Sequence, residues 1–122
     1  MMSEASTREV GERAEQAAVD YLVDSNYVIV ERNWNYHNIG EIDIIAVKDE
    51  TLVFVEVRYR TSTRYGLPEL SISHGKWQKL RKTAKLYLAK HGAYRSKACR
   101  FDVIAIDMMS GEASLRHYVN CL

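Results

Sequence analysis

Residues 40–60 read GEIDIIAVKDETLVFVEVRYR, and this stretch decides the fold. Two apolar runs rich in β-branched residues, at 41–47 and 52–58, are separated by a short polar segment. So short a polar gap between two such runs is typical of a β-hairpin. We therefore predict two antiparallel strands here, with Lys48 paired to Thr51 across the turn.

Counting outward from that pair, Asp43 falls directly opposite Glu56, and Glu41 falls opposite Arg58. Because side chains alternate between the two faces of a strand, these four charged residues are predicted to share one face of the hairpin. The other face then carries four apolar residues: Ile42, Ile44, Val55 and Val57.

Two carboxylates placed side by side on neighbouring strands repel each other and destabilise the sheet. Three things could neutralise Asp43 and Glu56: a shared proton, the guanidinium of Arg58, or a divalent cation. Carboxylate oxygens suit Mg²⁺ or Mn²⁺, which bind through one or two acids together with phosphate oxygens and water. The residues alone leave two interpretations open. One is a metal site, and the other is a cluster in which Arg58 forms ion pairs with the acids.

The rest of the chain predicts two helices and three further strands. The expected elements are a helix from Thr7 to Asp24, a strand from Tyr27 to Trp34, a helix from Glu69 to His91, and strands from Phe101 to Ile106 and from Ala113 to Val119. With the hairpin included, the order is α-β-β-β-α-β-β. This order predicts an α/β sandwich with a mixed central sheet.

The totals are those of an ordinary globular protein. The 122 residues suit one domain, with residues 1–6 expected to be a disordered tail. The chain contains no apolar run long enough to span a bilayer and no secretory signal pattern. We expect a cytoplasmic protein with no membrane partner, in which Cys99 and Cys121 do not form a disulfide.

Positive charge is concentrated in one segment, although the net charge is only +1. No acidic residue lies between Glu69 and Asp102, a stretch that carries nine basic residues: Lys76, Lys79, Arg81, Lys82, Lys85, Lys90, Arg95, Lys97 and Arg100. Such a segment would attract a polyanion, and Lys76, Lys79 and Lys82 are candidate nucleic-acid contacts. A solvated lysine-rich helix face is the alternative. Arg60, in a segment that mixes aromatic and basic residues, is a fourth candidate contact.

Several stretches together resemble a known family of uncharacterised bacterial proteins, the YraN family. The matching stretches are AEQAAVDYL (14–22), NYVIVERNW (26–34), GEIDIIAV (40–47), VFVEVRYR (53–60), the helix at 76–88 and RFDVIAID (100–107). The pairing of an Asp on one strand with E-x-R on the next is also similar to the restriction-endonuclease-like superfamily, which includes archaeal Holliday-junction resolvases.

The resemblance implies a restriction-endonuclease-like fold for residues 1–122, with Asp43 and Glu56 as metal-binding acids. It also implies that Glu15 on the first helix belongs to the site, and Glu41 is a candidate auxiliary ligand. Arg58 departs from the superfamily pattern, because it stands where the superfamily has a lysine. An arginine is always protonated and cannot act as a general base, but it can stabilise negative charge on a phosphate.

Three functions are consistent with this pattern. The first is a Mg²⁺- or Mn²⁺-dependent endonuclease that acts on DNA rather than RNA, on branched or damaged structures. The second is a nucleic-acid-binding module that keeps the fold without the chemistry. The third is a scaffold in which the acids are paired to Arg58. By analogy with the resolvases, a homodimer is a further possibility.

Overall fold

A computed structural model describes residues 7–62, 66–68, 72–109 and 114–121. Its elements are α1 (Thr7–Asp24), β1 (Val28–Tyr36), β2 (Gly40–Lys48), β3 (Thr51–Arg60), α2 (His74–Lys90), the short 3₁₀-helix η2 (Gly92–Tyr94), β4 (Ala98–Asp107) and β5 (Ser114–Tyr118). The predicted order of two helices and five strands is confirmed. The predicted tail at residues 1–6 lies outside the described residues.

The five strands form one sheet in the order β1-β2-β3-β4-β5. Strands β3 and β4 run parallel, joined by the crossover helix α2, and the other three neighbouring pairs are antiparallel. The sheet is therefore mixed, as the sequence predicts, and β3 is its central strand. The α/β class of the fold is confirmed.

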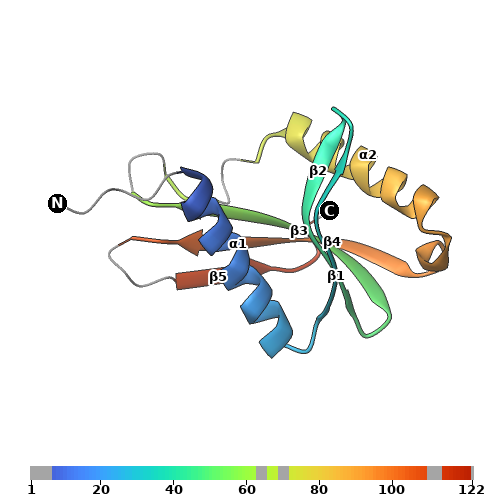
Figure 1. The fold of residues 1–122 in the computed structure, drawn as a ribbon, viewed down its shortest axis with the longest axis horizontal. Coiled ribbons are helices and arrows are strands. Elements are labelled where there is room, and N and C mark those ends of the chain that lie inside the picture. Colours follow the sequence, from blue (N-terminus) through green and yellow to red (C-terminus); the bar gives the residue numbers. More distant parts are fainter. Residues whose placement is uncertain (1–6, 63–65, 69–71, 110–113, 122) are drawn as a thin grey trace.

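The two helices cover opposite faces of the sheet (Figure 1). Helix α1 packs its buried residues Ala14, Ala18 and Leu22 on one face, which we call the α1 face. Helix α2 packs Leu80 and Tyr87 on the other, the α2 face. Each face has its own cluster of fully buried apolar side chains, which makes β2 and β3 apolar on both sides.

The hairpin register is as predicted near the turn, where pairing runs from Lys48–Thr51 to Ile44–Val55. Beyond Ile44 the ladder between β2 and β3 ends, so the predicted pairing of Glu41 with Arg58 is wrong. The predicted face assignment is also wrong for Ile42, which packs on the α2 face, whereas Ile44 packs on the α1 face.

Helix α2 begins later than the sequence pattern predicts. Ser73 is the N-cap residue, with extended backbone angles, and its hydroxyl accepts a hydrogen bond from the amide of Lys76. The expected start at Glu69 falls on residues outside the described part, but Ile72 and Ser73 precede the helix. The helix ends at Lys90. Among the described residues, no helix is long and apolar enough to cross a membrane.

Candidate functional site

Asp43 and Glu56 come together where β2 and β3 part. Asp43 lies one residue beyond the last paired residue of β2, and its Oδ2 accepts a hydrogen bond of 2.8 Å from the amide of Val57. Glu56 lies on β3, is only 5% exposed, and is hydrogen-bonded to the Asp43 carboxyl. The predicted neighbourhood of the two acids is confirmed, although the strands no longer pair there.

The pKa of Asp43 lies well above the ordinary value for an aspartate. Burial, followed by the hydrogen bond and negative charge of Glu56, raises the pKa of Asp43 to about 8. The amide of Val57 and the charge of Lys76 act in the opposite direction. The Asp43 carboxyl is therefore protonated near neutral pH, and a bound cation would instead favour its ionised form.

One oxygen of Glu56 is buried without a hydrogen bond. Among the described residues, nothing donates a hydrogen bond to Oε2, which is fully enclosed. The ammonium of Lys76 on α2 stands 3.5 Å from this oxygen, an ion pair longer than a charge-assisted hydrogen bond. A buried carboxylate oxygen left in this way costs free energy, and a divalent cation would relieve the cost.

A break in strand alternation turns Asp43 toward helix α1. Asn33 of β1 lies between the paired residues Arg32–Ile44 and Trp34–Ile42, and therefore faces Asp43. Its φ is +52°, in the left-handed region that asparagine tolerates better than most residues. Opposite Asn33, Ile42 and Ile44 of β2 point to different faces of the sheet.

Glu15 of α1 is held beside this break. Its Oε1 accepts hydrogen bonds from the side-chain amide of Asn33, at 2.8 Å, and from Nε of Arg32, at 3.2 Å. The Glu15 side chain is 14% exposed. The resemblance to the nuclease superfamily pointed to Glu15, and the structure places it in the same pocket as Asp43.

The pocket between α1 and the sheet has a volume of about 970 Å³. Its lining includes Glu15, Asp43, the aromatic side chain of Tyr59 and three arginines: Arg8, Arg13 and Arg32. Two of the arginines are already paired with acids, Arg8 with Glu12 and Arg32 with Glu15. The pocket therefore brings together four acids, Glu9, Glu12, Glu15 and Asp43, and the three arginines, and guanidinium groups beside a carboxylate-bound cation would suit a phosphate.

Glu41 does not complete a metal site with Asp43 and Glu56. Within the described residues there is no group of three or more His, Cys, Asp or Glu side chains arranged to hold an ion. Glu41 is exposed, because the break in β2 separates its direction from that of Asp43. Partial burial and the charges of Asp43 and Glu15 raise the pKa of Glu41, so it contributes to the negative field of the site.

Two oxygen ligands still fit the expected cation. Mg²⁺ and Mn²⁺ are commonly held by one or two carboxylates, with water and substrate phosphate supplying the other ligands. Asp43 and Glu56 provide such a pair, and the buried Oε2 of Glu56 lacks a hydrogen-bond donor among the described residues. The donor set therefore fits the group that the sequence predicts.

Comparison with known proteins identifies the family. A family model described as "Uncharacterised protein family UPF0102" matches residues 14–106, most of the chain. The chain belongs to this family. A UPF0102 protein of Persephonella marina is 50% identical over 96 residues, covering 79% of this chain and 81% of the relative. A UPF0102 protein of Stutzerimonas stutzeri is 44% identical over 105 residues, covering 86% and 85%.

The UPF0102 family model spans every residue of the acid pair and its surroundings, since Glu15, Asn33, Asp43 and Glu56 all fall within residues 14–106. The sequence prediction of an uncharacterised bacterial family is confirmed. The names of the UPF0102 relatives state no activity, so the function must be argued from the site.

Two arginines predicted to contact nucleic acid or phosphate have different surroundings in this UPF0102 chain. Arg58 lies on β3 two residues beyond Glu56, which places both side chains on the α2 face. Arg60 is bound by the carboxylate of Asp107 and donates a 3.0 Å hydrogen bond to the carbonyl of Gly66. Arg116 pairs with the same Asp107, so this cluster joins β3, β4 and β5 and these three side chains together carry one net positive charge.

The predicted basic segment divides into a surface part and an internal part. Lys79 and Lys82 are exposed on α2, and Lys76 is 42% exposed beside Glu56. Arg100 instead turns inward, where it pairs with the fully buried Asp102. The helix lysines therefore remain candidate nucleic-acid contacts, whereas Arg100 serves the interior of the fold.

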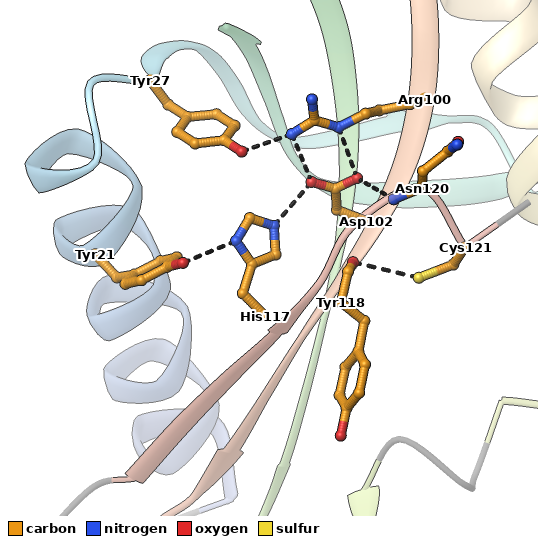
Figure 2. A network of polar contacts seen from close by, with 8 residues as sticks. All are labelled: Tyr21, Tyr27, Arg100, Asp102, His117, Tyr118, Asn120 and Cys121. Carbon is orange, nitrogen blue, oxygen red and sulfur yellow. Dashed lines mark hydrogen bonds and ion pairs between the residues drawn. The ribbon is translucent and has the colours of Figure 1, made fainter.

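Asp102 is the centre of a second polar cluster (Figure 2). Its oxygens accept hydrogen bonds from Arg100 and from the amide of Asn120, and lie 2.8 Å from Nε2 of His117. The His117 ring in turn lies 2.9 Å from the hydroxyl of Tyr21 on α1. The cluster therefore links α1, β4 and β5. Because each oxygen of Asp102 already has a hydrogen-bond partner, the cluster is not a site for an ion.

Sequence reasoning missed Asn33 and Arg32 as parts of the site. Both lie in the stretch NYVIVERNW, which the sequence pattern assigns to an ordinary strand. Their role follows from the left-handed φ of Asn33, and a strand pattern does not reveal a single residue of this kind. An asparagine inside a β-branched run is the one available signal, because asparagine is rare in strand interiors.

Proposed function

We propose that this UPF0102 protein is a Mg²⁺- or Mn²⁺-dependent endonuclease with a restriction-endonuclease-like fold, acting on the phosphodiester bonds of branched or damaged DNA. The observation that carries the proposal is the buried pair of carboxyl groups, Asp43 and Glu56. Asp43 has a raised pKa and lines a pocket that three arginines also line, and Glu56 Oε2 lacks a hydrogen-bond donor among the described residues.

The pair makes no sense as a stabilising feature of the sheet. Two acids in contact at a buried position reduce stability, and one of them must hold a proton to be tolerated. Sites that reduce stability in this way are common where a protein binds a cation or performs chemistry. The mixed sheet, with a helix on each face and acids where two strands part, also agrees with the superfamily resemblance.

Each residue has a defined role in the proposed reaction. Asp43 and Glu56 would hold the cation, which would polarise the phosphodiester and make a nearby water more acidic. Lys76 brings a positive charge to Glu56 and can orient that water. Glu15, fixed by Asn33 and Arg32, borders the pocket as an auxiliary acid.

Arginine side chains supply the positive charge for the phosphate. Arg8, Arg13 and Arg32 line the pocket beside Asp43. Arg58, next but one to Glu56, can stabilise negative charge that builds on the phosphate. A guanidinium can donate two parallel hydrogen bonds to a phosphate, which orients the substrate as well as neutralising it.

Metal binding and cleavage test the proposal together. Calorimetric titration with Mn²⁺ should give binding to the wild-type protein that is lost in Asp43→Asn and in Glu56→Gln. The exposed Glu50, at the hairpin turn away from the pair, provides a matched control in Glu50→Gln. If Mn²⁺ binds equally well to all four proteins, the assignment of this pair as the metal site is wrong.

Forked, nicked and four-way-junction DNA, incubated with the protein and Mn²⁺, should be cut by the wild type and left intact by Asp43→Asn. The second candidate function is a nucleic-acid-binding module without catalysis, which the arginine at position 58 favours. Tight binding of these substrates with no cutting in any divalent cation would establish the module and reject the nuclease.

A further inference from the structure

Tyr36 is an aromatic side chain that does not pack in the hydrophobic core. It ends strand β1 at the β1–β2 turn and is half-buried. It belongs to neither core cluster of the described residues, although its neighbour Trp34 packs against one of them. Its ring stacks with Trp34 at a centroid distance of 5.9 Å and 26° between planes, and the His37 ring meets its edge.

A lysine stands over the ring of Tyr36. The ammonium of Lys90, at the end of α2, lies 5.1 Å from the ring centroid. Lys90 is exposed, so its flexible side chain can leave the ring at little cost. The ring can therefore become available to a planar ligand, while the ammonium remains close enough to contact an anionic group of that ligand.

Helix α2 supplies a strongly positive surface beside this ring. It contains six basic residues and no acidic residue. Five of the six are exposed to solvent: Lys79, Arg81, Lys82, Lys85 and Lys90. A cationic helix next to an aromatic side chain is complementary to a polyanion that also carries flat apolar groups, which describes a nucleic acid.

Tyr36 and the acid pair lie toward opposite ends of the same helix. Lys76, in the first turn of α2, contacts Glu56, and Lys90, in the last turn, stands over Tyr36. Between them, Gly40 of β2 lies against the α2 residue Thr83. Figure 1 shows strand β2 beside helix α2. At 1.5 Å per residue, the axial distance from residue 76 to residue 90 is about 21 Å, which is the reach of a few nucleotides.

We propose that a single-stranded segment of DNA lies along α2 and stacks one unpaired base on the ring of Tyr36. The inference rests on the proposed function and adds to it the kind of DNA that the site recognises. Bases inside a duplex are already stacked on their neighbours, so only an unpaired base offers a free face to the tyrosine ring. Lys90 then moves from the ring to the adjacent phosphate.

Equilibrium binding without metal tests this surface separately from catalysis. In buffer with EDTA, fluorescence anisotropy compares a labelled oligothymidylate with a blunt duplex of equal length. Tyr36→Ala should weaken single-strand binding roughly tenfold, as expected for one lost base–aromatic contact. Tyr36→Phe, which keeps the ring, should bind like the wild type. Tyr118→Ala removes an exposed tyrosine on β5, at the other edge of the sheet, as a matched control.

Two further readouts make the result specific. Because Tyr36 carries no charge, Tyr36→Ala should leave the salt dependence of binding unchanged. Lys90→Met should instead make the plot of log affinity against log salt concentration less steep, by the amount expected for roughly one lost phosphate contact. Duplex affinity should be the same in Tyr36→Ala and the wild type. Equal single-strand affinity for Tyr36→Ala and wild type would overturn the proposal, and so would an equal loss for single strand and duplex.

The outcome is independent of whether the protein cuts DNA. A tyrosine-dependent preference for single strands, without any cleavage, would support this surface and reject the nuclease. Cleavage that depends on Asp43, with no effect of Tyr36→Ala on binding, would do the opposite. Circular dichroism melting of each variant shows whether the change at Tyr36 has disturbed the fold.

Discussion

The side-chain amide of Asn33 lies 2.8 Å from the carboxylate of Glu15 and so joins the edge strand β1 to helix α1 beside the acid pair. Asn33 can make this contact because its backbone is left-handed, with φ of +52°. On the neighbouring strand, Ile42 and Ile44 lie on different faces of the sheet, and Asp43 between them lines the pocket. Asn33 therefore anchors one acid of the pocket, Glu15, and lies opposite another, Asp43.

Replacing Asn33 should loosen the site and the fold together. Asn33→Ala loses the hydrogen bond to Glu15 and places an alanine in the left-handed region, each at a cost of about 1 kcal/mol. Asn33→Gly relieves the backbone but still loses the hydrogen bond, so its free energy of unfolding should lie between those of Asn33→Ala and the wild type. Urea unfolding measures the order, and a glycine variant less stable than the alanine variant would contradict it.

Removing the carboxyl group of Asp43 should stabilise the metal-free protein. The folded pKa of about 8 exceeds the ordinary value of 3.8, so between these pH values the folded state holds a proton that the unfolded state has lost. Stability therefore falls as pH rises from 3.8 to about 8 and levels off above that value. Asp43→Asn removes this dependence while its amide oxygen still accepts the Val57 hydrogen bond.

Urea unfolding in EDTA at pH 5 and pH 9 measures this effect. We expect the wild type to lose a few kcal/mol more than Asp43→Asn between the two pH values. Glu50→Gln, at the exposed turn, should follow the wild type. A variant that loses stability with pH as steeply as the wild type would show that Asp43 is ionised in the folded protein at neutral pH.

The contribution of Asp102 to the free energy of unfolding should depend on pH in the opposite direction from that of Asp43. Burial raises its pKa, but the hydrogen bonds from His117, Arg100 and the amide of Asn120 together outweigh burial and lower it. A carboxyl group with a lowered folded pKa stabilises the protein above its ordinary pKa of 3.8, and this contribution is lost as pH falls through the folded value. The wild type should therefore lose stability below about pH 4.

Asp102→Asn should lower the free energy of unfolding at pH 7 by about 3 kcal/mol, because Arg100 is left without its buried counter-charge. The variant should also lose less stability than the wild type when the pH falls to 3. Asp24→Asn, on the exposed end of α1, should change stability by less than about 0.5 kcal/mol. Guanidinium titrations at both pH values measure these differences, and equal losses for Asp102→Asn and Asp24→Asn would rule out the charge network.

Gly40 and Thr83 should be coupled, because the strand and α2 touch at these two residues. A Cβ at Gly40 would stand 2.4 Å from the Thr83 hydroxyl oxygen, which is buried and hydrogen-bonded to the Lys79 carbonyl. Gly40→Ala should therefore destabilise the protein by roughly 1 to 3 kcal/mol. Combined with Thr83→Ala, which removes that oxygen, the loss should be smaller than the sum of the two single losses. Additive losses in a double-mutant cycle would mean that no clash occurs.

The sequence predicts the class of fold because several local patterns agree with one another. The apolar spacing of α1, the polar gap after Val47 and the polar residues around Gly111 each indicate the element that should follow. The start of α2 was misplaced because the apolar pattern extends upstream, whereas the hydroxyl of Ser73 decides where the helix begins. The N-cap hydrogen bond therefore sets the first residue of the helix, even where a weak apolar pattern continues upstream.

The acid pair could be predicted, but the geometry around it could not. The pairing of Asp43 with Glu56 follows from counting along a hairpin, which holds as far as Ile44. The end of the β2–β3 ladder, the exposure of Glu41 and the anchoring of Glu15 by Asn33 all accompany an interruption of regular strand alternation. Strand periodicity assumes that side chains alternate without interruption, so it fails wherever one residue leaves the extended region.

The parallel pairing of β3 with β4 has a consequence for the order in which the protein forms on the ribosome. Each residue of β3 pairs with one 47 positions later, from Thr51 with Ala98 to Arg60 with Asp107. The hairpin of β2 and β3 can close early, but one side of β3 stays open until β4 has been synthesised. During that interval an apolar strand edge is exposed to other chains. Slow or interrupted synthesis of the segment between β3 and β4 should therefore favour aggregation over folding.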